Sequence, residues 1–296
     1  MILEIDIKGR ILIIITIIVF FSAFKVAAQP QDKPNDVFAN KIDSYFRYMP
    51  SRSVDAMEGK VEIVEADSEY SYELKLFGKL PVKFSLDNKY IGIEDSVTNV
   101  ALPAHLVGLT TDIEATLSFF NFDQTYLRIG LSPSFYGDDW DFETSAFRLL
   151  SRLLILYIPN AKWTFLAGVA VYPDFENEAL PVLGFVYKPN DKLAFNIIPP
   201  RPNITYLLND QVTLFGEGGS SLNSEFEVTR NDTKNVVLRY KEMHLGVGIK
   251  LKLNKFIQSS LSFGSVFNRS LKYRDNQGKV EIKNGLYGEF RTEIAF

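Results

Sequence analysis

The chain has 296 residues, and its 32 lysines and arginines against 36 aspartates and glutamates give a formal net charge of −4. No segment is rich in lysine or arginine, which excludes a general nucleic-acid binder, because phosphate recognition needs a basic surface. Since the chain has no cysteine and only two histidines, it forms no disulfide or thiolate metal site, and a multi-histidine metal centre is not expected.

Residues 1–28 have the pattern of a secretory signal peptide. An apolar stretch over residues 11–21 follows two basic residues, and small residues stand before a cleavage point after Ala28. The alternative is a membrane anchor, but the apolar stretch is shorter than the about 20 residues that a spanning helix needs. We therefore expect export and cleavage, followed by a polar periplasmic lead-in over residues 29–40, which contains two prolines.

The clearest strands lie near the end of the chain. From Glu242 to Leu253, every second residue is apolar, and glycine, histidine or charged residues lie between them. A period of two over twelve residues predicts a strand with one apolar and one polar face. Residues 257–273 repeat the pattern, and Asn254-Lys255 forms a two-residue turn between the runs. The two runs are therefore predicted to form a hairpin.

The same rule divides the remaining chain into strands joined alternately by short turns and longer polar connections. Six short and seven long connections make thirteen, which predicts fourteen strands and places both termini on the same side. Twelve or sixteen strands remain open, because the proline-rich residues 199–202 are difficult to count. The short turns are at residues 78–81, 121–123, 159–161, 189–191, 209–210 and 254–255, and the long connections at 50–58, 95–103, 137–142, 174–178, 199–202, 231–235 and 275–278.

This organisation is typical of an all-β, closed antiparallel transmembrane β-barrel of a bacterial outer membrane, here over residues 41–296 with both termini periplasmic. A soluble β-sandwich is the alternative, but its strands average about 5–6 residues, whereas several runs here are much longer. Aromatic residues also gather at both ends of the strands, as at the two water–lipid boundaries. They are Phe77, Phe119, Phe122, Tyr157, Trp163, Tyr187 and Phe256 beside the short turns, and Tyr48, Phe135, Trp140, Tyr172, Phe175 and Tyr273 near the long connections.

The chain ends at Phe296, which closes an alternating strand. A C-terminal phenylalanine in this position resembles the signal that the outer-membrane barrel assembly machinery recognises. The alternative is an ordinary aromatic terminus. Together with the leader and the alternation, we interpret Phe296 as a barrel-assembly signal.

Several motifs in the middle and C-terminal parts of the chain occur in a fixed succession. They are Leu131-Ser132-Pro133, Phe135-Tyr136-Gly137-Asp138-Asp139, Phe147-Arg148-Leu149, Leu180-Pro181-Val182-Leu183-Gly184-Phe185, Tyr187-Lys188-Pro189, Pro200-Arg201-Pro202-Asn203-Ile204-Thr205-Tyr206, Tyr240-Lys241-Glu242 and Gly246-Val247-Gly248. This succession is similar to the outer-membrane β-barrel family catalogued as domain of unknown function 6268, over residues 102–296. The resemblance implies a barrel in the outer membrane, and it brings no agreed activity, substrate or catalytic residue.

If the apolar side of each strand faces lipid, the opposite side faces the lumen. Arginine or lysine on the lipid side near the bilayer midplane costs about 2–4 kcal/mol, so charged side chains belong inside. They could line a wet pore that orients polar solutes, or they could close the lumen by pairing with one another. The expected lumen-lining residues are Asp112, Glu114, Arg128, Arg148, Arg152, Glu217, Glu242, His244, Lys250, Glu289, Arg291 and Glu293.

Acidic residues crowd two long connections, at positions 138–143 and 174–178. Such carboxylates could hold Ca²⁺ or Mg²⁺, but without an ordered ligand spacing a solvated loop is the simpler interpretation. His105 and His244 could be general bases of a lipid-modifying barrel enzyme, but no serine or acid stands at a spacing that specifies a triad. We therefore expect no enzyme and no catalytic, cofactor or metal site.

The function predicted from the sequence is a passive outer-membrane pore for small polar solutes, which works without a cofactor. A non-conducting structural or surface-binding barrel is the first alternative, and a lipid-modifying barrel enzyme is the second. The expected location is the outer membrane of a Gram-negative bacterium. The expected partners are its lipid and lipopolysaccharide, the barrel assembly machinery and small polar solutes, and no nucleic acid.

Overall fold

The computed structural model describes residues 40–77, 80–118, 122–140, 144–173, 175–221, 224–231, 233–274 and 278–296. The expected signal peptide, and all but the last residue of the expected lead-in, lie outside the described residues. No helix in the described ranges is long and apolar enough to cross a membrane.

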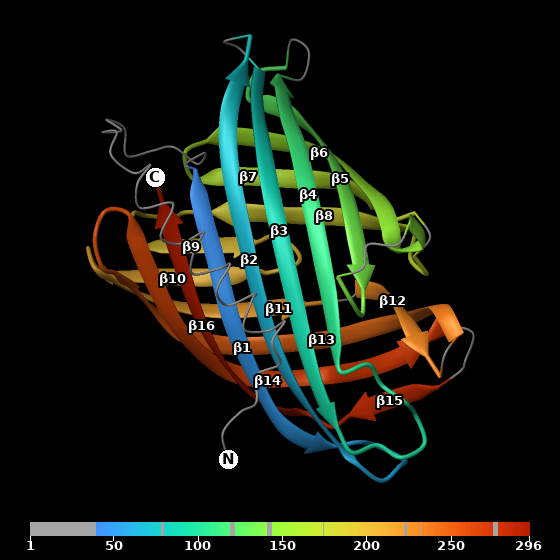
Figure 1. The fold of residues 1–296 in the computed structure, drawn as a ribbon. Helices are drawn as coiled ribbons and strands as arrows, with labels where there is room; N and C mark the ends of the chain where they lie inside the picture. The colour runs from blue at the N-terminus through green and yellow to red at the C-terminus, as the bar shows by residue number, and fades with distance from the viewer. Residues whose placement is uncertain are drawn as a thin grey trace.

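The described chain is almost entirely β-structure, wound into a barrel (Figure 1). The elements are β1 (Lys41–Ser53), β2 (Lys60–Leu76), β3 (Leu80–Asp95), β4 (His105–Ser118), β5 (Thr125–Gly137), a short 3-10 helix η1 (Thr144–Ala146), β6 (Phe147–Asn160), β7 (Trp163–Val171), β8 (Ala179–Tyr187), β9 (Leu193–Ile197), β10 (Asn203–Asn209), β11 (Val212–Ser220), β12 (Ser224–Arg230), β13 (Thr233–Lys252), β14 (Ile257–Tyr273), β15 (Lys279–Ile282) and β16 (Gly285–Ala295).

Around the ring, these sixteen segments fill fourteen strand positions. β11 and β12 pair with successive parts of β13 and together act as one interrupted strand. β15 and β16 do the same along β14, so sixteen minus two gives fourteen. The ring closes where β1 pairs antiparallel with β16. The prediction of a closed, antiparallel barrel of fourteen strands is therefore confirmed.

Most connections alternate between short and long as predicted, which gives the barrel a short-turn end and a long-loop end. Two connections predicted to be long differ: only two residues join β12 to β13, and the β9–β10 connection is no longer than the β8–β9 turn. Four of the short turns use the same chemistry. Asn160, Asn190, Asn209 and Asn254 each accept, at the side-chain oxygen, the backbone N–H groups two and three residues further along. Asparagine favours tight turns for this reason. Two strands extend well into predicted connections: β1 continues past Pro50 to Ser53, and β13 begins at Thr233.

Apolar side chains cover the outside of the barrel. On β13, Leu245 and Val247 are 64% and 54% exposed, whereas their neighbours Glu242 and His244 are 2% and 5% exposed. The alternation of the sequence therefore places charge inside and hydrocarbon outside, the reverse of a soluble sandwich, whose strands bury their apolar face. Exposed apolar residues of this kind occur on strands around the ring, including Phe46, Leu86, Ile113, Leu131, Leu153, Phe165, Leu183, Ile204, Leu214, Phe263 and Phe290.

The barrel wall is uneven in height. β2 and β3 have 17 and 16 residues, whereas β9 and β10 have only 5 and 7. Residues 198–202, called the tip below, join β9 to β10 and contain three prolines. Proline has no N–H to donate, so it stops a β-ladder. The wall is therefore low at β9 and β10, at the place where the strand count was difficult.

The long-loop end is closed by a second, smaller arrangement. β12 turns inward and meets β5 in a parallel bridge between Glu227 and Gly137, and Asp138 donates its backbone N–H to the carbonyl of Glu227 at 3.1 Å. Apolar side chains from β1–β4 and β12–β16 fill the space enclosed. They include Met49, Ile63, Ile91, Leu106, Phe226, Leu238, Leu271, Tyr273 and Ile282. The sequence suggested that the inward side is polar. This is wrong for the long-loop end, where the inward side forms an apolar core.

Candidate functional site

On the short-turn side of the apolar core, one arginine forms ion pairs with strands that are far apart in the sequence. Arg47 of β1 is 1% exposed. Its guanidinium contacts Glu289 of β16 at 2.6 Å, Glu242 of β13 at 2.8 Å and Glu65 of β2 at 3.4 Å. These four residues and His244 are called the Arg47 cluster. Because β13 lies three positions from β1 around the ring, the cluster links walls that share no ladder.

The members of the cluster contact one another closely, and Tyr240 of β13 also donates a hydrogen bond to Glu242 at 3.1 Å. The His244 ring lies 3.1 Å from Glu242 through Nδ1 and 3.2 Å from Arg47 through Nε2. Gly219 of β11 makes room for the ring, because a Cβ there would lie 2.2 Å from it. A buried ion pair is tolerated only when the remaining hydrogen-bonding groups are also satisfied. With Nε2 facing a guanidinium instead of a hydroxyl, His244 is not arranged as the base of a serine triad.

The tip reaches across the barrel interior toward the same region. The guanidinium carbon of Arg201 lies 4.3 Å from the centre of the Tyr45 ring, on β1. Ile198 packs on the opposite side, against the apolar cluster formed by Leu154, Leu156 and Leu166. The tip therefore contacts the inner face of the barrel on two sides, with a cation at Tyr45 and an apolar contact at the leucine cluster.

A second charged group lies on the inner face of β4–β6. Arg152 pairs with Asp112 and with Glu114, the latter at 2.9 Å, and Arg128 pairs with Glu114 at 3.2 Å. The Arg152 side chain is 36% exposed, unlike that of Arg47. Arg152 is therefore the most accessible member of this group, whereas Asp112 and Glu114 are mostly buried.

The structure distributes the expected lumen-lining residues over three zones. Glu242, His244 and Glu289 belong to the Arg47 cluster, and Asp112, Glu114, Arg128 and Arg152 form the second group. The others are more dispersed: Arg148 lies 4.0 Å from Glu227 near the long-loop end, Glu217 accepts a hydrogen bond from Ser262, Arg291 pairs with Asp43, Glu293 pairs with Lys41, and Lys250 lines a cavity at the short-turn end.

The short-turn end has two adjoining cavities, of about 540 and 480 Å³, which share Leu207 and Thr213. Their linings carry five lysines, Lys162, Lys188, Lys192, Lys250 and Lys252, against Asp191 and Asp210. The resulting net charge of +3 makes this mouth attractive to anions.

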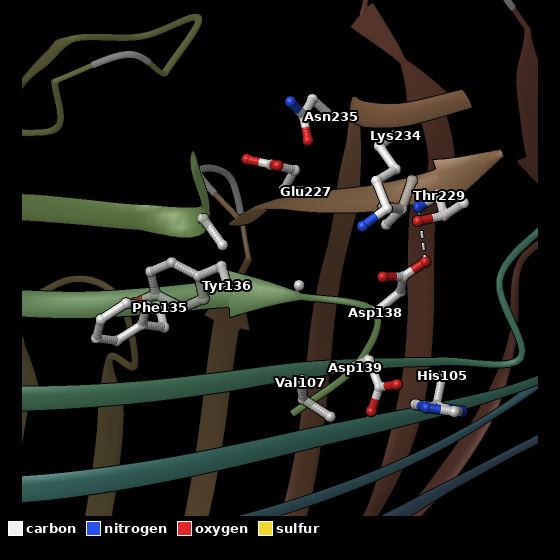
Figure 2. Close-up of a pocket in the computed structure, with 13 residues that line it drawn as sticks. His105, Val107, Phe135, Tyr136, Asp138, Asp139, Glu227, Thr229, Lys234 and Asn235 are labelled. Atoms are coloured by element: carbon white, nitrogen blue, oxygen red, sulfur yellow. Dashed lines mark hydrogen bonds between the residues drawn. The ribbon is translucent and has the colours of Figure 1, made fainter. Parts of the chain in front are cut away.

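A further cavity, of about 380 Å³, lies at the β5–β12 junction (Figure 2). Asp138, which follows β5, accepts a hydrogen bond from the backbone N–H of Thr229 on β12 at 2.7 Å. His105 lines the cavity and stacks on Tyr90, 6.0 Å away. Within the described ranges, no three His, Asp or Glu side chains are grouped so as to hold a metal ion.

Three central residues of the interior, Arg47, Glu65 and Arg201, were missed by the sequence interpretation. On β1, both sides of the strand carry apolar or aromatic residues, so the period-two pattern does not separate Arg47 from its neighbours. Glu65 of β2 could have been found by alternation, since Asp67 and Glu69 share its side of the strand, opposite Tyr70 and Tyr72. Arg201 stands among prolines, where no period exists.

Phe296 lies at the short-turn end, beside the start of the barrel. Its backbone N–H bonds to the carbonyl of Asn40 at 2.9 Å, and its ring stacks on Tyr70 of β2 with centres 5.9 Å apart. The last residue is therefore held by the first strands.

Comparison with solved structures gives similar barrels at low identity. An outer membrane channel from Pseudomonas putida F1 has a TM-score of 0.46 and 11% identity, covering 91% of this chain and 100% of its own. A FadL homologue from Pseudomonas aeruginosa has a TM-score of 0.46 and 10% identity, covering 87% and 90%. LpxR from Salmonella typhimurium has a TM-score of 0.41 and 10% identity, covering 86% and 100%.

No curated protein matches the chain. A family model does match, over residues 145–293. The match begins later than residue 102, where the sequence motifs first suggested a relationship, and it covers the chain from η1 to β16. Because it covers half of the chain, the chain belongs to the family described as domain of unknown function (DUF6268).

Proposed function

We propose that this protein is a passive channel in the outer membrane of a Gram-negative bacterium. The observation that carries the proposal is the inverted wall, in which Leu245 and Val247 are exposed while Glu242 and His244, on the same strand, are buried. A wall with hydrocarbon outside and charge inside suits a lipid bilayer around a polar lumen. Small charged or polar solutes would cross along the lumen, driven by their gradient and without a cofactor.

Aromatic residues support the same placement. At the short-turn end, the rings of Trp163 and Tyr187 stack with centres 4.1 Å apart, and those of Tyr187 and Phe195 stack at 6.0 Å. Amphipathic rings favour the boundary between lipid and water. Short turns lie on the periplasmic side of such barrels, so both termini would be periplasmic. Lipid and lipopolysaccharide would surround the wall, and Phe296 would serve the assembly machinery.

The orientation is tested in intact cells. An epitope inserted in the long connection near Ser96 should bind antibody at the cell surface, whereas one inserted at Asn190 should bind only after the outer membrane is opened. The reverse pattern would contradict the orientation.

Conduction is tested by recording from the purified protein in planar bilayers. Discrete conductance steps are expected. Arg152→Glu should make the channel more selective for cations, because it changes a solvent-accessible lumen charge by two units. The matched control is Arg152→Gln. It changes the charge by half as much and should give an intermediate reversal potential. Absence of conductance steps would overturn the channel proposal.

A non-conducting structural or surface-binding barrel is a second candidate, and the filled long-loop end favours it. Leu106, Leu238 and Leu271 are fully buried there, so a straight route along the barrel axis is obstructed on that side. The same recording separates the two candidates, since a non-conducting barrel gives a silent bilayer.

A further inference from the structure

The barrel wall is incomplete between β8 and β11. β8 pairs with β9 over only three residue pairs, from Phe185↔Ile197 to Tyr187↔Phe195. Within the described chain, residues 179–184 have no ladder partner on that side. The facing edge is also free, because β11 pairs with β10 only as far as Glu217, and beyond it a single bond joins Gly218 to the carbonyl of Pro202. We call this interruption the lateral gap.

The lateral gap is bounded at both ends. The tip lies at its end nearer the short turns, and the β7–β8 connection lies at its end nearer the long loops. In that connection, the Glu176 carboxylate forms an ion pair with Arg239 of β13 at 2.5 Å, and its backbone N–H donates to Glu225 of β12 at 3.0 Å. The six residues of β8 without a partner on this side span about 20 Å along the strand, and three strand spacings at the level of the tip span about 14 Å.

The position of the lateral gap is at the level of the exposed apolar surface. Leu183, on its β8 edge, is 68% exposed and points outward. Pro181, on the same edge, has no N–H that would need a partner there. The edge is thus suited to face hydrocarbon without a neighbouring strand.

Inside the lateral gap, the inner face of the wall is apolar. Leu154 of β6 and Leu166 of β7 pack together, and Val182 of β8 and Ile198 of the tip pack against them. The partly exposed Arg152 of β6 and its partners Asp112 and Glu114 of β4 lie on the neighbouring wall. At the short-turn end, the lysine-lined cavities carry a net positive charge. The route therefore offers an apolar surface beside charges and ends in a mouth that attracts anions.

We propose that the lateral gap is a passage between the membrane and the lumen for small amphipathic organic anions. In the channel proposed above, the apolar core narrows the straight route at the long-loop end to small polar solutes, while the lateral gap and the short-turn mouth are both next to surfaces that suit a larger amphipathic molecule. The apolar body would move past Leu180 and Val182, the partly exposed inward side chains of β8, and the anionic group would move toward the lysines. This inference rests on the proposed channel function and names its substrate class and route.

The test compares two sulfonates that share a permanently charged group, octane-1-sulfonate and methanesulfonate. Release of each from vesicles of phosphatidylcholine and phosphatidylglycerol containing the protein is measured by mass spectrometry. Because the chain has no cysteine, Leu180→Cys places a unique thiol on the inward side of the gap edge. Leu183→Cys places the matched control on the outward side of the same strand. Each is modified with a bulky maleimide, and Leu180→Trp gives an obstruction without modification.

The unmodified protein should release octane-1-sulfonate at least tenfold faster than empty vesicles. An obstruction at residue 180 should slow this release at least fivefold, while modification at residue 183 should change it less than twofold. Correct folding of each variant is checked by its heat-modifiable gel mobility. Release of methanesulfonate should remain within twofold in all variants.

Two contrary results have different meanings. The lateral passage is overturned, and the channel remains, if methanesulfonate passes but octane-1-sulfonate does not. The same holds if the release of octane-1-sulfonate is unchanged by the obstruction at residue 180. If neither sulfonate passes and planar bilayers are silent, the channel proposal itself fails, and the lateral passage fails with it.

Discussion

The wall formed by β1–β5 differs from the wall formed by β6–β10. β2 and β3 pair through sixteen positions, from Val61↔Asp95 to Leu76↔Leu80, whereas β8 and β9 pair through three. The tall wall is fastened from inside by the Arg47 cluster and the apolar core, and the low wall has an apolar inner face beside free strand edges. The tall wall is therefore the more firmly packed side of the barrel, and the low wall is the side on which we place the lateral passage.

Removal of the central cation should have the largest effect on the tall wall. Arg47→Ala leaves the carboxylates of Glu65, Glu242 and Glu289 without their shared partner. Breaking a buried ion pair costs about 3–5 kcal/mol, so the free energy of unfolding should fall by about this amount. Guanidinium unfolding in detergent micelles, followed by tryptophan fluorescence, measures it.

The control for this prediction is Arg152→Ala on β6. The Arg152 side chain is partly exposed, so its ion pairs are screened by solvent, and the loss should be about 1 kcal/mol or less. Equal losses for the two variants would show that the two walls are not fastened differently.

The apolar core should be the next most sensitive part. Leu238→Ala on β13 removes a fully buried side chain and should cost about 2–5 kcal/mol, because a cavity remains. Leu245→Ala, on the same strand, should cost less, because lipid or detergent fills the space left by an exposed side chain. The same unfolding assay compares them, and a larger loss at Leu245 would contradict a packed long-loop end.

The close approach of β11 to His244 offers a smaller perturbation. Gly219→Ala would place a methyl group 2.2 Å from the imidazole ring, so the ring must move, at a cost of about 1–3 kcal/mol. Gly288→Ala on β16 is the control, since a Cβ there meets nothing within 4 Å. Its unfolding free energy should change by about 0.5 kcal/mol or less, and a similar cost at both positions would show that the ring is not tightly held.

The tip should affect passage more than stability. Arg201→Ala removes the side chain that lies 4.3 Å from Tyr45, which opens space between the tip and β1. Single-channel conductance should rise by roughly twofold, because the pore radius and its charges set the flow. Arg201→Lys keeps the charge and should give a smaller rise, and an unchanged conductance in Arg201→Ala would place the constriction elsewhere.

The strand arrangement could be predicted because its signals are local. Asn254 marks a turn, and the alternation from Glu242 to Leu253 marks a strand, without knowledge of any distant residue. The closure of the long-loop end could not be found in this way, since it joins Gly137 to Glu227, which no period connects. The packing of the tip on Leu154 is equally non-local.

The interior was predicted to be more polar than it is. Alternation assigns each strand one apolar side, but β6 and β7 are apolar on both sides, as in Leu149 and Leu150 or Leu153 and Leu154. A continuous apolar run indicates a strand covered on both faces, and this signal was present in the sequence. It identifies the low wall, where the interior does not resemble a uniformly charged pore.

The seam between β1 and β16 has a consequence for biogenesis. Its eight pairs run from Lys41↔Ala295 to Tyr48↔Gly288, so they join the two extremes of the folded region. Non-local pairings of this kind form slowly, because a long loop must first be closed. The cylinder thus cannot shut until its final strand has been exported, and until then both seam edges remain open to chaperones and to other chains.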